Sequence, residues 1–232
     1  MKIWKGAVIL AAIMLTFTQC SKDDEPSLLP VEEQNVIDDL AIGKYLQEHY
    51  FDSDGRVTRF DESSEADDSE TPLSQLAEQH GEFYVVKNPA VNAEGRAVVS
   101  NLQDSILIQY SLLGFRASRT NDTIRYGEPS TYYSTVHQSG YAQWDPTFYY
   151  VPRTSSVRPE QYEIPAIVEG LKHFNSTGRG PLENPPVRFQ GIIIAPSRAV
   201  FGRNTNQMSI PFDVSMVLNF ELLQVVDRDS VN

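Results

Sequence analysis

Few residues of this chain have the types and spacing that metal, acid–base or nucleophilic chemistry requires. The sequence contains four histidines, at His49, His80, His137 and His173. Their spacing matches no zinc pattern, and the only cysteine, Cys20, lies too close to the N-terminus to complete one. The acidic stretches at 21–25 and 61–70 lack the ligand order of a calcium loop. The sequence therefore predicts no metal site and no cofactor.

The N-terminus has the pattern of an export signal. Two lysines, Lys2 and Lys5, precede an apolar run at residues 7–17. The run is about 11 residues long, whereas a membrane-spanning helix needs roughly 20. The following FTQC at residues 17–20 resembles a bacterial lipobox, with Gln19 where a small residue is usual. We expect residues 1–19 to be a signal peptide and Cys20 to be lipidated. The alternative is ordinary signal cleavage, with Cys20 as an incidental thiol.

The residues after the cysteine suggest where the chain is anchored. SKDDE at residues 21–25 resembles the short acidic stretch that directs lipoproteins of Bacteroidota to the outer face of the outer membrane. Residues 20–31 then form a lipidated, acidic tether. We expect an outer-membrane lipoprotein exposed at the cell surface, or otherwise facing the periplasm.

The negative net charge of the chain argues against nucleic acid and anionic lipid as partners. The net charge is −12, and removing the two lysines of the signal takes it to about −14. Such a chain is repelled by nucleic acid and by anionic lipid, so membrane contact is expected only through the lipid on Cys20. No second cysteine exists to form a disulfide, so the fold must rest on its apolar core. The sequence leaves the oligomeric state open.

Hydrophobic spacing divides the chain into two regions. The apolar residues of 32–50 have helical spacing, and residues 72–79 favour a short helix. Residues 61–70, between them, are predicted to form a solvated acidic loop. Together these segments predict an N-terminal helical region over residues 32–80. From residue 82 the period changes to two. Strands are predicted at 83–86, 104–114, 187–195 and 214–226, with one helix at 165–174. This pattern indicates an α+β domain with a mainly antiparallel sheet and one short helix packed across it.

Four segments, taken in order along the chain, resemble the sequence motifs of a known protein family. They are 105–110 (SILIQY), 163–171 (EIPAIVEGL), 194–202 (IAPSRAVFG) and 210–223 (IPFDVSMVLNFELL). In order, they resemble the early tyrosine-bearing strand, the V-I-x-G-W-x-E-G/A-L helix, the I-P-x-x-L-A-Y-G loop and the last strand of the FK506-binding-protein (FKBP) family of peptidyl-prolyl cis-trans isomerases. The resemblance covers residues 81–227. It implies a curved sheet wrapped around the short helix, with residues 32–80 as an appendage.

The family's reaction explains why no catalytic triad is needed. Rotation about an X–Pro bond is resisted by roughly 18–20 kcal/mol because it breaks amide resonance. An apolar pocket that holds the proline ring and favours the twisted amide lowers this barrier, helped by donors to substrate carbonyls. The resemblance thus implies proline-containing polypeptides as substrates and no cofactor.

Carried over by position, the pocket comprises Tyr110, Ile164, Ile167, Phe201 and Leu218. Tyr110 would be a wall with a hydroxyl, the backbone N–H of Ile164 would donate to a substrate carbonyl, and Ile167 would form the floor. Phe201 and Leu218 would close the sides. Each of these positions is equally compatible with ordinary core packing.

The same positions depart from the family pattern. The family's floor is commonly tryptophan, its loop has a hydroxyl-bearing tyrosine, and its last strand has a phenylalanine, where this chain has Ile167, Phe201 and Leu218. The family's Phe-Asp pair has no clear counterpart, and Asp122 is the nearest candidate for its carboxylate. Losing these groups predicts reduced catalysis.

An insert over residues 115–162 is longer than a compact member of the family needs. Its aromatic residues are Tyr126, Tyr132, Tyr133, Tyr141, Trp144, Phe148, Tyr149 and Tyr150. Such residues either pack the insert against the sheet or form a recognition surface. Tyr149 or Tyr150 is a candidate for the aromatic side of the pocket.

Two functions from different classes remain open. The first is a membrane-tethered prolyl isomerase that assists folding of exported or surface proteins, with activity reduced by its departures from the family pattern. The second is a binding module with a decayed pocket that uses its tyrosine-rich insert to bind a protein or another surface partner. An open, proline-sized cavity lined by Tyr110, Ile164 and Ile167 would favour the first, and a filled one the second.

Overall fold

The structure is a computed structural model that describes residues 28–136, 142–154, 156–180 and 188–230. The chain divides into two compact units, Met1–Pro30 and Val31–Asn232. The second unit contains all the helices and strands discussed below. In the described part of the chain, no helix is long and apolar enough to cross a membrane.

The second unit is an α+β fold, as the sequence predicts. Its helices are α1 (Val31–Glu48), α2 (Leu73–Leu76) and α3 (Pro165–Leu171), with single 3₁₀ turns η1 (Pro159–Gln161), η2 (Ser197–Ala199) and η3 (Arg228–Ser230). Its strands are β1 (His49–Phe51), β2 (Val57–Arg59), β3 (Ala77–His80), β4 (Phe83–Lys87), β5 (Asp104–Thr120), β6 (Thr123–Tyr126), β7 (Ser130–Ser134), β8 (Gln143–Trp144), β9 (Gly191–Ala195) and β10 (Val214–Asp227).

The main sheet is built around one long strand, β5. Its strands follow the order β3-β4-β9-β10-β5-β6, and every pairing among them is antiparallel. One edge of β5 pairs with β10, and the other pairs in turn with the short strands β8, β7 and β6. The insert therefore folds back along β5 and covers its second edge. Strands β1 and β2 form a separate two-stranded sheet.

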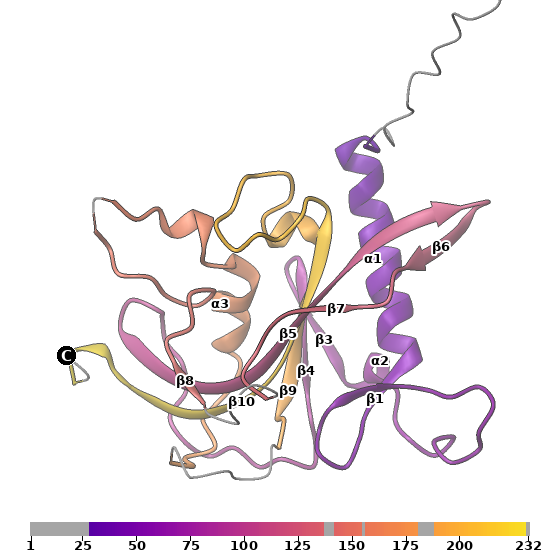
Figure 1. Cartoon of the computed structure of the whole chain (residues 1–232). Coiled ribbons are helices and arrows are strands. Elements are labelled where there is room, and N and C mark those ends of the chain that lie inside the picture. The colour runs from indigo at the N-terminus through magenta and orange to yellow at the C-terminus, as the bar shows by residue number, and fades with distance from the viewer. Residues whose placement is uncertain (1–27, 137–141, 155, 181–187, 231–232) are drawn as a thin grey trace, which may run out of the picture. The chain divides into compact units, whose positions relative to one another are not determined.

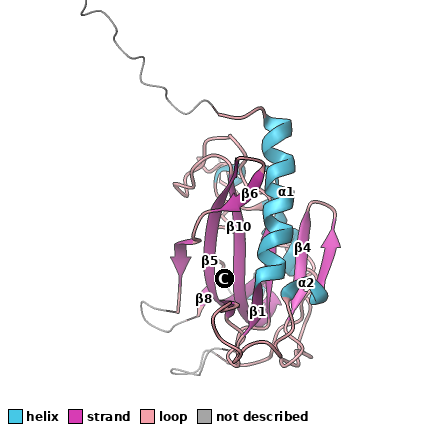
Figure 2. Cartoon of the chain, turned by 90° about the vertical axis from the view of Figure 1, so that its right-hand side faces the viewer, coloured by secondary structure: helices cyan, strands magenta, loops and turns pink. Residues whose placement is uncertain are grey.

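The two faces of the sheet are covered by different helices. Figure 1 shows α3 and α1 on opposite sides of β5 and β10, with the long strands curving around α3, and Figure 2 shows α1 running alongside the strands. Side chains alternate between the faces, as expected for a strand. One row of side chains from each long strand lies in the core around α3: Ile106, Ile108, Tyr110 and Leu112 from β5, and Val214, Met216, Leu218, Phe220 and Leu222 from β10.

Helix α3 lies close to the sheet because of a glycine. A Cβ atom added to Gly170 would come within 2.8–2.9 Å of the Ile193 side chain on β9. Any larger residue would force the helix and strand apart, so Gly170 sets their separation.

Helix α1 packs on the opposite face through apolar and polar contacts. The ring of Tyr45 stacks on that of Phe115 at 5.4 Å, and the Gln34 side chain donates a hydrogen bond to the carbonyl of Ala117 on β5. The buried carboxylate of Asp38 accepts hydrogen bonds from the Gln34 amide at 2.8 Å and from the backbone N–H of Ser197 at 3.1 Å. The N-terminal helix is thus tied to the turn that follows β9.

Several element boundaries differ from those predicted. The helix predicted over 72–79 is only four residues long, because Ala77 adopts extended backbone angles and residues 77–80 pair with β4. The helix predicted over 32–50 ends at Glu48, since residues 49–51 pair with β2. In both cases strand pairing outweighs local helical preference. Strand β5 also runs six residues beyond its predicted end, where β6 pairs with it.

Burial of the Asp38 carboxylate raises its pKa, in spite of its hydrogen bonds to Ser197 and Gln34. A carboxyl whose pKa is higher in the folded state stabilises the fold below its unfolded pKa, and this stabilisation is lost as the pH rises through the folded value. We therefore predict that Asp38→Asn, which keeps an acceptor for Ser197, becomes more stable relative to the wild type between pH 4 and pH 7. Chemical denaturation at both pH values measures this.

Asp39→Asn is the matched control, because the Asp39 carboxylate is half exposed and pairs with Arg198 at 2.9 Å. It should show no relative gain as the pH rises. An equal gain in both variants would contradict the role given to Asp38.

Candidate functional site

The five residues carried over from the family pattern meet in one place. Tyr110 comes from β5, Ile164 and Ile167 from the start of α3, Phe201 from the turn after β9, and Leu218 from β10. All five belong to a single apolar cluster, and each side chain is between 0% and 6% exposed. The structure brings these five residues into one cluster, but it buries them instead of leaving them around an open pocket.

The Tyr110 hydroxyl already has a partner within the chain. It donates a hydrogen bond of 3.0 Å to Oε1 of Gln143 on β8, and its ring meets the edge of Phe148 with centroids 4.8 Å apart. Burial, with a smaller contribution from Tyr133, raises the pKa of Tyr110 to about 12. The hydroxyl is therefore a neutral donor at physiological pH, and Gln143 accepts its hydrogen bond.

The backbone N–H of Ile164 is also engaged. Ile164 precedes the first turn of α3 in an extended conformation, with φ −98° and ψ 107°, and Pro165 begins the helix. Its N–H donates to the carbonyl of Phe148 at 2.8 Å. Its own carbonyl accepts from the N–H groups of Ile167 and Val168. The donor expected to meet a substrate carbonyl is occupied by the insert.

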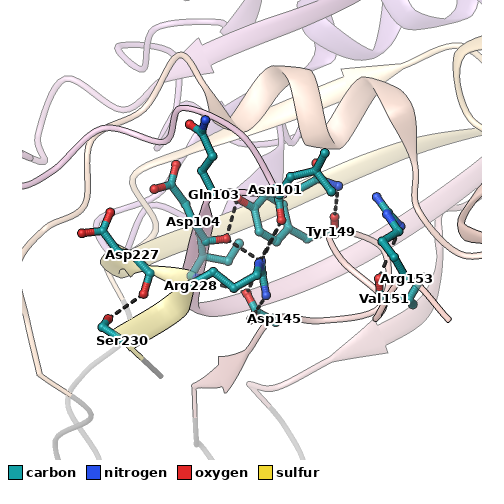
Figure 3. Close-up of polar contacts among 12 residues, drawn as sticks. Asn101, Gln103, Asp104, Asp145, Tyr149, Val151, Arg153, Asp227, Arg228 and Ser230 are labelled. Atoms are coloured by element: carbon teal, nitrogen blue, oxygen red, sulfur yellow. Dashed lines mark hydrogen bonds and ion pairs between the residues drawn. The ribbon is translucent and has the colours of Figure 1, made fainter. Parts of the chain in front are cut away.

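A segment of the insert, residues 145–151, covers this cluster and is held at its two ends. At the first end, the Arg228 guanidinium pairs with the Asp145 carboxylate at 2.8 Å and donates to the carbonyls of Asn101 and Asp104 (Figure 3). The same guanidinium lies 3.4 Å from the centre of the Tyr150 ring. One arginine therefore joins the C-terminal end of β10 to the covering segment.

At the second end, the holding group is Glu163, just before α3. Its carboxylate pairs with Arg153 at 2.6 and 2.9 Å and accepts from the backbone N–H of Val151 at 3.0 Å. Asn101 completes the arrangement, because its side-chain amide donates both to Glu163 and to the carbonyl of Tyr149 at 2.8 Å. These bonds restrain the backbone of the covering segment on both sides of Phe148.

The three remaining candidates, Tyr149, Tyr150 and Asp122, differ in how they lie relative to the apolar cluster. Tyr149 is fully buried and its hydroxyl reaches the carbonyl of Asp104 at 3.4 Å, while Tyr150 packs against the apolar cluster from outside. Asp122 is exposed, in the left-handed turn between β5 and β6. At about 3.3 Å per strand residue, it lies on the order of 30 Å along β5 from Tyr110. The structure does not bring Asp122 together with the other candidates. Cys20 lies outside the described residues.

Most aromatic residues of the insert pack inward. Phe148 and Tyr149 are buried, and the Tyr126 hydroxyl hydrogen-bonds the Glu48 carboxylate of α1. Tyr133 and Trp144 are each 39% exposed, and the Tyr133 hydroxyl donates to the carbonyl of Met208. Tyr141 lies outside the described residues.

Sequence reasoning missed Gln143, Phe148 and Arg228 as residues of the site. The aromatic run at 148–150 was visible, but nothing in it distinguished Phe148 from its neighbours. Gln143 contacts Tyr110 only because β8 pairs with β5, and Arg228 follows the last segment of the resemblance. Among the described residues, no group of three or more His, Cys, Asp or Glu side chains is arranged to hold a metal ion.

No known family model matches this chain, and no curated protein matches it. Among solved structures it is similar to a peptidyl-prolyl cis-trans isomerase from Pseudomonas syringae pv. tomato, with TM-score 0.39 and 11% identity over 86% of this chain and 98% of that one. It is also similar to FkpA from Escherichia coli, with TM-score 0.35 and 17% identity over 85% of this chain and 63% of that one. At these values the likeness carries no argument about activity, which must come from the residues.

The Arg228 contacts generate a stability prediction. Replacing Arg228 with methionine removes its pair with Asp145 and leaves the carbonyls of Asn101 and Asp104 without that donor. We expect a loss of about 2–4 kcal/mol in the free energy of unfolding, because the group is charged and largely buried. Denaturant titration measures it.

Arg119→Met is the comparison, since the Arg119 side chain makes a more exposed pair with Glu33. It should cost less than about 1 kcal/mol. Equal losses in the two variants would show that Arg228 does not hold the covering segment.

Proposed function

We propose that this protein is a weakly active peptidyl-prolyl cis-trans isomerase, held at a membrane by lipid on Cys20, that acts on proline-containing exported polypeptides. The observation that supports this is the convergence of Tyr110, Ile164, Ile167, Phe201 and Leu218. These residues come from four separate parts of the chain and were chosen from sequence alone. They form one apolar cluster at the start of α3, as the family's proline pocket requires.

The cluster is proposed to act on its substrate through the apolar surroundings and the hydrogen-bond donors that it provides. When the covering segment moves aside, Ile167 would offer an apolar floor for a proline ring, flanked by Phe201 and Leu218. Such a site would stabilise the twisted amide, whose carbonyl is less conjugated, more than the planar ground state, and so would lower the barrier between them. The Tyr110 hydroxyl and the Ile164 N–H are the two donors on hand to orient a substrate carbonyl.

Weak activity follows from the bonds that must first be broken. The N–H of Ile164 must leave the carbonyl of Phe148, and the Tyr110 hydroxyl must leave Gln143. At about 1 kcal/mol for each neutral hydrogen bond, the two together reduce the rate roughly 30-fold. The missing loop hydroxyl at Phe201 reduces it further.

The anchoring part of the proposal rests on the N-terminal sequence. The signal pattern at 1–19, Cys20 and the acidic residues after it support a lipoprotein of the outer membrane, exposed at the cell surface. Residues 20–31 would then act as the tether. An isomerase so placed would meet polypeptides as they fold after export.

A second function is favoured by one specific observation. The covering segment fills the space above Tyr110 and Ile164 with Phe148, which is the arrangement expected of a binding module that has lost catalysis. In that case the half-exposed Tyr133 and Trp144 of the insert would be the groups that meet a partner.

A protease-coupled prolyl isomerisation assay on the purified full chain in detergent separates the two functions. We predict a rate above the uncatalysed one that falls at least tenfold in Ile167→Ala. Ile192→Ala is the matched control, because Ile192 is equally buried but lies outside the cluster around α3. Both truncations cost about 2–5 kcal/mol of stability, so only a loss of rate confined to Ile167 reports on the pocket. A folded wild-type chain with no rate above background would leave the binding module as the function.

A further inference from the structure

A cavity lies at the opposite end of α3 from the apolar cluster of the proposed proline pocket. It has a volume of about 250 Å³ and is bounded by the end of β4, the loop after it, the residues that follow α3, and the start of β9. Its lining residues are Lys87, Asn88, Val91, Asn92, Ala93, His173, Phe174, Asn175 and Gln190. None of these belongs to the five residues of the proposed proline pocket.

Two basic side chains of this cavity have no acidic partner. In the described part of the chain, Lys87 forms no ion pair, and its ammonium group lies 5.9 Å from the centre of the Phe174 ring. The His173 ring stacks on that of His80 with centroids 3.8 Å apart, and no hydrogen bond to the His173 side chain occurs among the described residues. Lys87 is an exposed residue, so its positive charge is open to a ligand in this cavity.

His173 is affected by burial and by neighbouring charges of both signs. Its pKa is lowered first by burial and then by His80 and Lys87, while Glu78 and Glu169 act in the opposite direction. The Nε2 atom of His80 is itself buried without a hydrogen-bond partner, and the nearest carboxylate oxygen, on Glu78, is 3.6 Å away. Of these basic groups, Lys87 and His173 line the cavity and have unused hydrogen-bonding capacity for an anion, while His80 lies outside the lining.

The rest of the lining limits what kind of anion fits. The buried amides of Asn88 and Gln190 each use one N–H within the chain, to Phe189 and Asn175, and an amide nitrogen has two. Phe174, with Val91 beside it, supplies an apolar wall. A volume of about 250 Å³ is far above the roughly 10–15 Å³ that a single water needs on the same measure, so a carboxylate with a short apolar chain can enter. Glu78 and Glu169 disfavour an ion with two negative charges.

We propose that this cavity is a binding site for a small monocarboxylate, with Lys87 as its principal cation and Phe174 as its apolar contact. The carboxylate comes either from a free short-chain acid or from the C-terminus of a peptide. The site does not depend on isomerase activity, since none of its residues lines the proline pocket.

Histidine NMR on the full chain tests the site with sodium butyrate as the probe. We expect saturable shifts of the His173 and His80 ring signals, with affinity at least tenfold weaker in Lys87→Met, because a charge-assisted bond is lost. Lys87→Arg should restore most of the affinity. Lys44→Met removes one positive charge from α1, far along the chain from the cavity, and should leave the affinity unchanged.

Titrations with other ligands identify the source of the carboxylate. A tripeptide with a free C-terminus that binds more tightly than butyrate, while its C-terminal amide does not bind, assigns the site to peptide ends. Tighter binding of butyrate assigns it to a free acid. Phosphate binding more tightly than either would overturn the assignment to a monocarboxylate. The absence of saturable shifts with both carboxylates, or an unchanged affinity in Lys87→Met, would overturn the site itself.

Discussion

The antiparallel pairing of β5 with β10 is the constraint on which the rest of the structure depends. The two strands run side by side from Asp104 and Asp227 at one end to Arg116 and Val214 at the other, with one irregularity between Leu222 and Gln224. Nearly every side chain along this pair is buried, on both faces. A sheet buried on both faces needs a cover on each, and α3 and α1 supply those covers. The register of this pair therefore decides which residues can meet at the start of α3.

The covering segment is a consequence of the same strand. Because β10 occupies one edge of β5, the insert can pair only with the other, and it does so through β8, β7 and β6. Pairing of β8 at Leu107 and Ile108 delivers Gln143 to the Tyr110 hydroxyl and places Phe148 next to the N–H of Ile164. The polar groups that a prolyl isomerase would offer to a substrate are thereby satisfied within the chain. Opening the pocket costs these bonds, and this cost would slow any catalysis at the site.

Much of the fold could be predicted from the sequence, for physical reasons that apply to particular elements. Strands β5 and β10 alternate apolar residues with period two because one face of each packs on α3, and that period is visible locally. Helix α3 is marked by Pro165 at its first position and by apolar spacing. The conversion of residues 77–80 from helix to strand could not be predicted, because it depends on pairing with β4.

The state of the candidate site was harder to predict. The five pocket residues could be named because their segments resemble a family, yet resemblance says nothing about what covers them. Gln143, Phe148 and Arg228 act through contacts with residues that are distant in sequence, and the insert that carries the first two has no counterpart in the matched segments. Burial of Asp38 similarly depends on the Ser197 turn, about 160 residues away.

The most direct test of the account is amide hydrogen exchange at Ile164 in the full chain. If the N–H of Ile164 is held by the carbonyl of Phe148 beneath a restrained segment, it should exchange on the order of a hundredfold more slowly than an unstructured amide. Arg228→Met should reduce this protection by loosening residues 145–151. An Ile164 amide that exchanges at the rate of an unstructured chain, in a folded protein, would contradict the closed pocket and with it the explanation of weak activity.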